Sequence, residues 1–178
     1  MAYNPNSGVI VAAYRSSQNN YIVAGEVKEN GINFGNPTQF EYQASTSALA
    51  FDSTSGKFLL AYRETNTYAN VIDAVRNTIA IGPRVQIYPS GSEAISIIDN
   101  VNLGKPVVFL KVGSQLAALV VTISGRTATA SSANTETVGI SEWMSATYDP
   151  VSGKAIVVYR DQNNSQYGTA RTATTSGS

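Results

Sequence analysis

Four short apolar runs divide the chain at regular intervals, and each follows a polar turn. They occupy residues 9–14, 58–62, 106–110 and 155–159. Hydrophobic residues follow one another in these runs without polar alternation, and β-branched residues are common among them. A run of this kind is typical of a strand covered on both faces of its sheet. We therefore expect four inner strands, one in each of four similar units.

The turn before each run is repeated as closely as the run itself. The turn glycines lie 48, 48 and 49 residues apart: Gly8, Gly56, Gly104 and Gly153. Four residues before each glycine is an Asn or an Asp: Asn4, Asp52, Asn100 and Asp149. Such a side chain opens a tight turn by accepting backbone hydrogen bonds, and glycine supplies the positive φ that other residues resist. The pattern predicts four hairpins that lead into the apolar runs.

Each unit also contains the pattern of two later strands. A third strand is expected at residues 21–27, 68–75 and 116–123, after a second polar turn. A fourth, at residues 32–42 and 79–88, contains Gly and Pro, which are typical of edge strands and bulges. Four strands in about 48 residues is the size of a β-propeller blade. The alternative, a right-handed parallel β-helix, has shorter coils and lacks regular hairpins. We predict an all-β, propeller-like array of four-stranded antiparallel repeats in a single domain, residues 1–178.

The number of predicted strands bears on assembly. The units supply three, four, four and three strands, because the first unit has no evident first strand and the last no evident fourth. This amounts to about 3.5 repeats, and open sheet edges invite pairing with another chain. Two copies would supply enough strands for a closed ring of seven blades, which predicts a homo-oligomer. A monomeric four-bladed ring with trimmed edges is the alternative.

Composition and charge exclude several classes of function. Twelve basic residues balance twelve acidic ones, and no basic cluster contains aromatic residues, so we expect no nucleic-acid binding. Cys and His are both absent, which excludes disulfides, thiolate or imidazole zinc sites, thiol nucleophiles and the usual neutral-pH general base. The apolar runs fall far short of about 18 residues, so neither a signal peptide nor a membrane span is expected.

The repeated acids are candidates for a metal site. Asp52 and Asp149 stand in oxygen-rich loops, where they would suit calcium. The equivalent positions in the other two units hold Asn, which caps a turn as well as Asp does. We therefore prefer turn capping and expect no metal or other cofactor.

Repeated Tyr-Arg pairs are the strongest catalytic candidates: Tyr14-Arg15, Tyr62-Arg63 and Tyr159-Arg160. Sialidases hold an anionic sugar with several Arg and a Tyr. These pairs, however, recur at equivalent positions, whereas catalysis needs unlike groups that converge on one point. We therefore expect no enzyme activity, and we expect each Arg to span between neighbouring units to carbonyls or carboxylates such as Glu64 and Asp161. The residues assigned to the structural repeat are Asp52, Gly56, Arg63, Asp149, Gly153 and Arg160.

Positions where the units differ are better candidates for recognition. Trp143 is the only tryptophan, and the sibling units have Thr46 and Ala94 in its place. It is either a packing replacement or an exposed platform for a sugar ring. The loop tips combine Asn, Gln, Ser and Tyr, which suit adaptable polar contacts with glycan or protein and are equally common in solvated loops. The tip candidates are Asn19, Asn20, Tyr21, Asn66, Tyr68, Asn163, Asn164 and Tyr167.

The repeated unit also resembles a known family. Its pattern is [YF]-[DN]-P-x-S-G-K-x-x-V-x-Y-R-D followed by N-x-x-Y-G-T-A, best preserved at residues 148–170 and most altered in the third unit. This unit resembles a repeat found in virion structural proteins of bacteriophages, especially those of marine cyanobacteria. The resemblance covers nearly the whole chain. It implies a virion component, such as a capsid decoration, head fibre, knob or tail appendage, assembled in the host cytoplasm with other virion proteins and able to contact a host-surface glycan. A soluble lectin-like β-propeller is the alternative, and a sialidase-like glycosidase is the third possibility.

Overall fold

Residues 1–174, which the computed structural model describes, form four antiparallel sheets and one short 3-10 turn, η1 (Gln162–Asn164). Sheet 1 contains β1 (Ala2–Asn4), β2 (Val9–Ser16), β3 (Asn19–Lys28), β4 (Gly31–Phe34) and β5 (Thr38–Tyr42). Sheet 2 contains β6 (Thr46–Asp52), β7 (Lys57–Arg63), β8 (Thr67–Val75), β9 (Thr78–Ile81) and β10 (Val85–Tyr88). Sheet 3 contains β11 (Ala94–Asn100), β12 (Lys105–Val112), β13 (Gln115–Ser124), β14 (Thr127–Ala130) and β15 (Asn134–Thr137). Sheet 4 contains β16 (Ile140–Asp149), β17 (Lys154–Asp161) and β18 (Gly168–Thr174). The all-β, antiparallel prediction is therefore confirmed.

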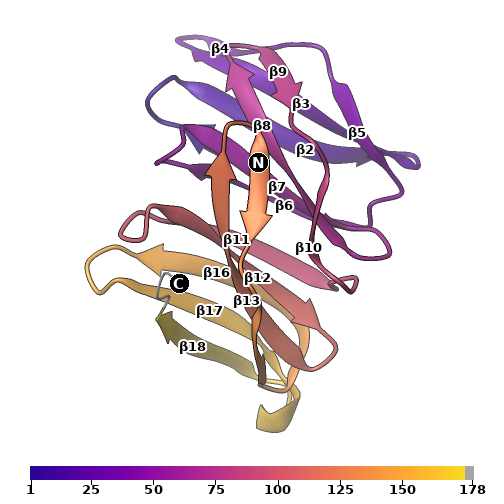
Figure 1. The fold of residues 1–178 in the computed structure, drawn as a ribbon, viewed down its shortest axis with the longest axis vertical. Coiled ribbons are helices and arrows are strands. Elements are labelled where there is room, and N and C mark those ends of the chain that lie inside the picture. The colour runs from indigo at the N-terminus through magenta and orange to yellow at the C-terminus, as the bar shows by residue number, and fades with distance from the viewer. Residues whose placement is uncertain (175–178) are drawn as a thin grey trace.

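The sheets are stacked face to face in chain order (Figure 1), from sheet 1 in indigo to sheet 4 in yellow. Each of three hydrophobic clusters joins two neighbouring sheets. Phe58 of sheet 2 packs with Val11 of sheet 1, and Phe109 of sheet 3 packs with Val157 of sheet 4. The stack forms an open row, and residues 1–174 form no closed propeller.

All four hairpin turns have the geometry expected from the sequence. Each turn glycine has a φ between 66° and 70°, and its N–H donates to the carbonyl of the Asn or Asp four residues earlier at 2.9 or 3.0 Å. The Asp or Asn side chain accepts a second backbone hydrogen bond within the turn. For example, Ser55 N donates to Asp52 Oδ2 at 3.1 Å, and Leu103 N donates to Asn100 Oδ1 at 3.0 Å.

The fourth strand of sheets 1 to 3 is broken into two segments. In sheet 1, β4 pairs with the end of β3 and β5 pairs with its beginning. The break in sheet 1 contains Gly35, and that in sheet 2 contains Gly82. A Cβ on Gly35 would lie 1.8 Å from the carbonyl oxygen of Asn77, and one on Gly82 would lie 1.9 Å from that of Arg126. Each glycine therefore admits the backbone of a hairpin turn from the next sheet.

The predicted strand count is corrected at the N-terminal end. The first unit does have a first strand, because Ala2–Asn4 pairs with β2 as β1. Three residues are too few for a recognisable alternation, which is why the pattern did not predict this strand. Sheet 4 contains three strands within the described residues, so a fourth is missing there as expected.

The prediction that the inner strands are covered on both faces holds for two of them. Every residue from Phe58 to Tyr62 of β7 and from Pro106 to Leu110 of β12 is buried. In β2 and β17, fully buried residues alternate with partly or fully exposed ones. The reason is position, because sheets 1 and 4 end the stack and each has only one neighbour.

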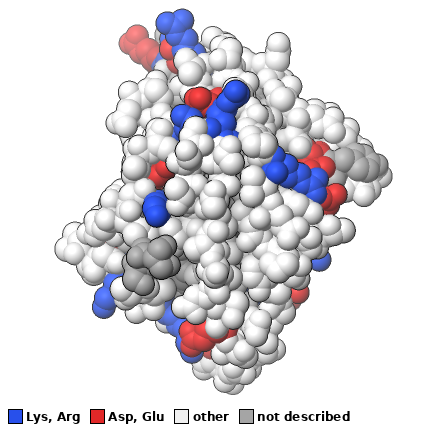
Figure 2. All heavy atoms as spheres, in the orientation of Figure 1, with Lys and Arg blue, Asp and Glu red and all other residues white. Residues whose placement is uncertain are grey.

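Across the described chain, no helix is long and apolar enough to cross a membrane. The face shown in Figure 2 carries Lys and Arg in small separate groups, several of them beside Asp or Glu. The even balance of charge in the sequence is thus repeated locally on this face.

Candidate functional site

Each sheet in the stack has two distinct faces. We call the face that meets the preceding sheet the leading face and the opposite one the trailing face. On the second strand of a sheet, residues two, four and six positions after the turn glycine lie on the leading face, because side chains alternate along a strand. In sheet 2 these are Phe58, Leu60 and Tyr62, all fully buried against sheet 1.

The leading face of sheet 1 has no preceding sheet within the described chain. Tyr14 is 42% exposed, whereas its equivalents Tyr62 and Tyr159 are 0% and 4% exposed. Tyr3, opposite Ile10 in the β1–β2 pair, lies on the same face and is half exposed. The side chains of Ile32 and Phe34 lie over Gly25 on this face, and both are more than 40% exposed.

This uncovered face continues across sheet 1 from β1 to β4. Its large exposed members are Tyr3, Tyr14, Val27, Ile32 and Phe34. Tyr14 and Tyr21 stack with ring centroids 5.8 Å apart, which holds the Tyr14 ring in place. A contiguous exposed apolar face of this kind commonly marks an interaction surface.

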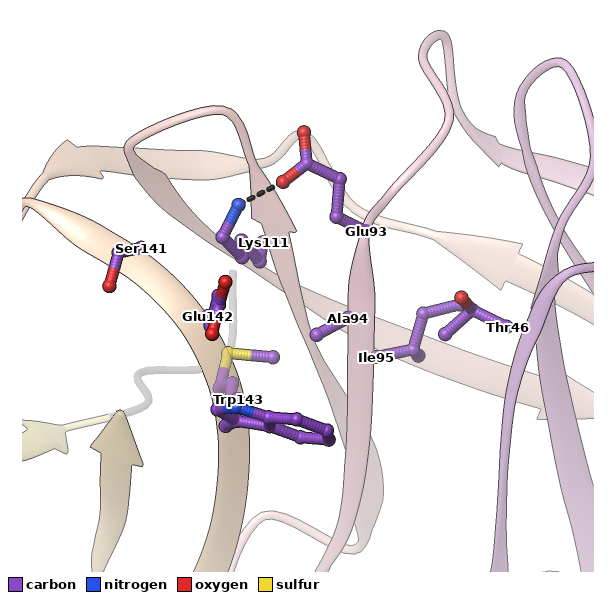
Figure 3. A pocket seen from close by; sticks show the side chains of 9 residues that line it. Thr46, Glu93, Ala94, Ile95, Lys111, Ser141, Glu142 and Trp143 are labelled. Carbon is purple, nitrogen blue, oxygen red and sulfur yellow. Dashed lines mark hydrogen bonds and ion pairs between the residues drawn. The ribbon is translucent and has the colours of Figure 1, made fainter. Parts of the chain in front are cut away.

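Trp143 lies beside a hollow of about 500 Å³ (Figure 3). The hollow is near the starts of β6, β11 and β16, which are the first strands of sheets 2, 3 and 4. Its lining includes Thr46 of β6, Ala94 and Ile95 of β11, and Glu142 beside the tryptophan. The Trp143 side chain extends from β16 toward the strand that carries Ala94, as Figure 3 shows. The hollow therefore joins the corresponding ends of three sheets.

The backbone holds Trp143 outward. Its φ is 45°, in the left-handed region that non-glycine residues rarely adopt, and the β16–β17 register shifts between Glu142 and Met144. Trp143 is 80% exposed. Of the two interpretations left open by the sequence, packing replacement and exposed platform, this exposure fits the platform.

An ion pair between a buried lysine and a half-exposed glutamate borders the same hollow. Lys111, 5% exposed, pairs with the Glu93 carboxylate. The hydrogen bond from Lys111 is the main cause that lowers the pKa of Glu93 below its ordinary value. The rim of the hollow thus carries a carboxylate held by Lys111 and by a backbone hydrogen bond from Gly113.

A second hollow, of about 440 Å³, opens on the trailing face of sheet 4. Val158, five positions after the turn glycine and 46% exposed, contributes to its floor. Gly168 and Met144 also line it, and Trp143 stands at its edge as well as beside the first hollow. The trailing face of sheet 4 is therefore open at the opposite end of the stack from the leading face of sheet 1.

The first loop tip supplies fewer free groups than predicted. Asn20 is only 4% exposed, so its assignment as a recognition residue is wrong, because β3 places the side chain inside the sheet stack. The Asn19 side chain accepts a hydrogen bond from Gln39 Nε2 at 3.2 Å. Tyr21 is occupied by its stacking on Tyr14.

The second tip belongs to a polar cluster between sheets 1 and 2. Arg84 lies over the Tyr68 ring at 3.7 Å and pairs with Glu41 at 2.7 Å and with Glu64. Arg84 also lowers the pKa of Tyr68 by hydrogen bonding, whereas burial raises the pKa of Tyr62.

The neighbouring Asn66 side-chain amide faces that of Gln86, with two polar atoms 2.9 Å apart. Asn66 thus bonds within sheet 2, whereas Tyr68 supports the contact between sheets 1 and 2 through Arg84.

The fourth tip is the most open. Asn163 and Asn164 lie in η1 and are exposed, and Tyr167 is 69% exposed. Asp161 caps η1 by accepting a hydrogen bond from Asn163 N at 2.8 Å. Trp143 and this tip both lie at the end of sheet 4 where β16 begins and β17 ends.

The expected partners of the repeated arginines are corrected. Arg160 pairs with Glu142 on the adjacent strand at 2.9 Å, while Asp161 is engaged in its cap. Arg15 donates from Nε to the Ser17 carbonyl at 2.9 Å. The Glu64 carboxylate is paired with Arg84, a residue outside the repeated motif. Arg15 and Arg160 thus bond within their own units, Arg15 to a carbonyl and Arg160 to a carboxylate other than the one named from the sequence.

No model of a known protein family matches this chain, and no curated protein matches it in sequence. Within residues 1–174, no three acidic, histidine or cysteine side chains come together in a way that could hold a metal ion.

Proposed function

We propose that this protein is a non-enzymatic structural component that acts as an oligomer, with the leading face of sheet 1 buried against another chain. One observation supports this most strongly. The apolar run of β2 has the composition of a strand covered on both faces, as do those of β7 and β12, yet only one of its faces is covered. A second chain on the leading face would bury Tyr14 as Tyr62 and Tyr159 are buried within the stack.

A propeller-like ring shared between chains follows from the same proposal. The four sheets of one chain are stacked in order with one open face at each end, so further copies extend the row until it closes. Each chain contributes four sheets, so two copies would contribute eight. The sequence-based count of fourteen strands in each chain predicted seven blades for two copies. How many copies close the ring depends on the angle between successive sheets.

We further propose that the assembly belongs to a bacteriophage particle. The supporting observation is the resemblance of the repeated unit to that of phage virion structural proteins. A chain without Cys suits a particle exposed to changing redox conditions. The proposed partners are copies of this chain, other virion proteins and a host-surface glycan, and the proposed location is the virion.

Measuring the oligomer mass tests the structural proposal. Analytical ultracentrifugation across a hundredfold range of concentration should give a multiple of 18.8 kDa that dissociates on dilution. A protein that remains monomeric at all concentrations would contradict the proposal. Mass spectrometry of purified particles tests the virion assignment separately, because absence from intact virions would refute it without affecting the oligomer.

A second candidate function is saccharide binding at Trp143. The outward position of this side chain beside the 500 Å³ hollow favours it, since an apolar ring face with neighbouring carboxylates suits a sugar ring and its hydroxyls. Trp143 is the only tryptophan, so the protein's tryptophan fluorescence reports on the surroundings of this one side chain, which include both hollows. A glycan array combined with fluorescence titration should identify a saccharide that shifts the emission, and the Trp143→Ala variant should no longer bind it. Silence in both measurements would remove this candidate.

A further inference from the structure

We propose that the oligomer assembles head to tail, with the trailing face of sheet 4 in one copy packed on the leading face of sheet 1 in the next. Tyr14 of the second copy then enters the 440 Å³ hollow over Val158 of the first. This inference rests on the proposed function, because it specifies which surfaces make the contact.

The three contacts inside the chain follow one rule that identifies the partner surface. In each, the residue six positions after a turn glycine shares a hydrophobic cluster with the residue five positions after the preceding turn glycine. The pairs are Tyr62 with Ala13, Leu110 with Ala61, and Tyr159 with Phe109. A leading face therefore always meets a trailing face. The open leading face belongs to sheet 1, and the trailing face left open in residues 1–174 belongs to sheet 4.

The same rule pairs Tyr14 with Val158. Tyr14 is six positions after Gly8, and Val158 is five positions after Gly153. Val158 lines an apolar hollow together with Gly168, which has no side chain and where an added Cβ would meet no atom within 4 Å. An open depression thus lies where the repeat requires a residue of the next leading face. A tyrosine in such a depression is the kind of anchor that contributes most to interface stability.

The two open faces also complement each other in side-chain size. The leading face of sheet 1 presents large side chains, among them Tyr3, Tyr14 and Phe34. The trailing face of sheet 4 presents mainly small ones around Ile156 and Val158: Ser145, Thr147, Ala170 and Thr172. Large side chains pack closely against small ones, whereas two leading faces would oppose large side chains to each other. The structure therefore favours a leading-to-trailing contact over a symmetric contact between two leading faces.

Two variants with one blocked face each test the inference. Tyr14→Lys places a charge on the leading face, and Val158→Lys places one on the trailing face. Each variant alone should be monomeric where the wild type is oligomeric, with its dissociation constant raised at least tenfold. An equimolar mixture should form a two-chain complex, because the intact trailing face of one variant fits the intact leading face of the other. Val151→Lys is the matched control, since Val151 is 95% exposed in a turn, and it should retain the wild-type mass.

The outcomes separate this inference from the proposed function. If Tyr14→Lys is monomeric and Val158→Lys keeps the wild-type mass, the contact is symmetric; the head-to-tail inference is then wrong while the oligomer stands. If both variants keep the wild-type mass, the inference is also wrong. A monomeric wild type overturns both proposals. Circular dichroism checks that each variant is folded, and Phe34→Lys with Thr172→Lys supplies a second pair on the same two faces if the first pair does not fold.

Discussion

At the scale of single residues, the turn side chains explain why the repeat tolerates so much sequence change. The third unit has lost the Ser before its glycine and the Tyr before its cation, yet Asn100 still accepts a hydrogen bond from Leu103 N at 3.0 Å. The φ of Gly104 is 66°, within a few degrees of the φ of the other turn glycines. The turn depends on these two positions, so the residues around them are free to vary.

Replacing the capping side chain should therefore destabilise the protein. We expect Asp52→Ala to lower the free energy of unfolding by about 1 kcal/mol, the typical loss for a side chain that satisfies backbone donors. Asp52→Asn should be close to neutral, because Asn fills the equivalent position in two other turns. Chemical denaturation measures the free energy of unfolding of both variants. Equal losses in the two variants would show that the carboxylate charge, not the turn hydrogen bond, is what stabilises this position.

A second residue-scale prediction concerns pH. Because the pKa of Glu93 is lowered in the folded protein by Lys111, the pair stabilises the fold above the ordinary value of 4.5. That contribution is lost as pH falls through the lower pKa of the folded state. Denaturation curves from pH 7 to pH 3 should show this loss, and Glu93→Gln should reduce stability at pH 7 by about 1 kcal/mol, a modest figure because Glu93 is half exposed. Identical pH profiles for Glu93→Gln and the wild type would contradict this assignment.

At the scale of strands and turns, the sequence predicted the elements whose structure depends on neighbouring residues alone. The hairpins and inner strands are encoded by turn residues and apolar runs within a dozen positions, so the sequence shows them directly. The break in the fourth strand is different. Gly35 and Gly82 are required by the backbone of a hairpin more than 40 residues later, and no local pattern reveals that contact. Trp143 is a similar case, because its outward position depends on a register shift against β17.

These glycines provide the prediction at this scale. Gly82→Ala should lower the free energy of unfolding by about 1–3 kcal/mol, because the new methyl group would meet the Arg126 carbonyl oxygen and force the two sheets apart. Gly168→Ala is the control, since its Cβ would meet no atom within 4 Å, and both variants are made in the Tyr14→Lys background so that assembly does not contribute. Thermal and chemical denaturation compare the free energies of unfolding of the two variants. A loss in the control as large as that of Gly82→Ala would mean that backbone flexibility, not the contact between sheets, explains the effect.

At the scale of the whole molecule, four sheets in a row provide eight faces, and contacts between neighbours cover only six of them. The sequence does not distinguish covered faces from open ones, because every unit repeats the same apolar run. This is why β2 and β17 were expected to be covered on both faces. It is also why the candidate interaction surface could be located only from the structure, whereas Trp143 was identifiable as the residue that breaks the repeat.

Thermal stability should therefore depend on protein concentration. Association that buries the leading face of sheet 1 favours the folded state by mass action, so the wild-type Tm should rise with concentration. The Tm of Tyr14→Lys should stay constant over the same range. Scanning calorimetry at several concentrations measures both proteins. A wild-type Tm that does not change with concentration would argue against a coupled assembly.

The row of sheets has one more consequence, for the order in which the protein comes apart. Each hydrophobic cluster joins only two neighbouring sheets, so the loss of an end sheet leaves the other two clusters intact. Sheet 4, with three strands in the described chain, is the smaller end. Native-state hydrogen exchange should find the lowest protection in β18, rising toward β7 and β12, so that the isolated chain frays from its C-terminal sheet before it unfolds globally. Uniform protection in all four sheets would show that the row unfolds as one cooperative unit.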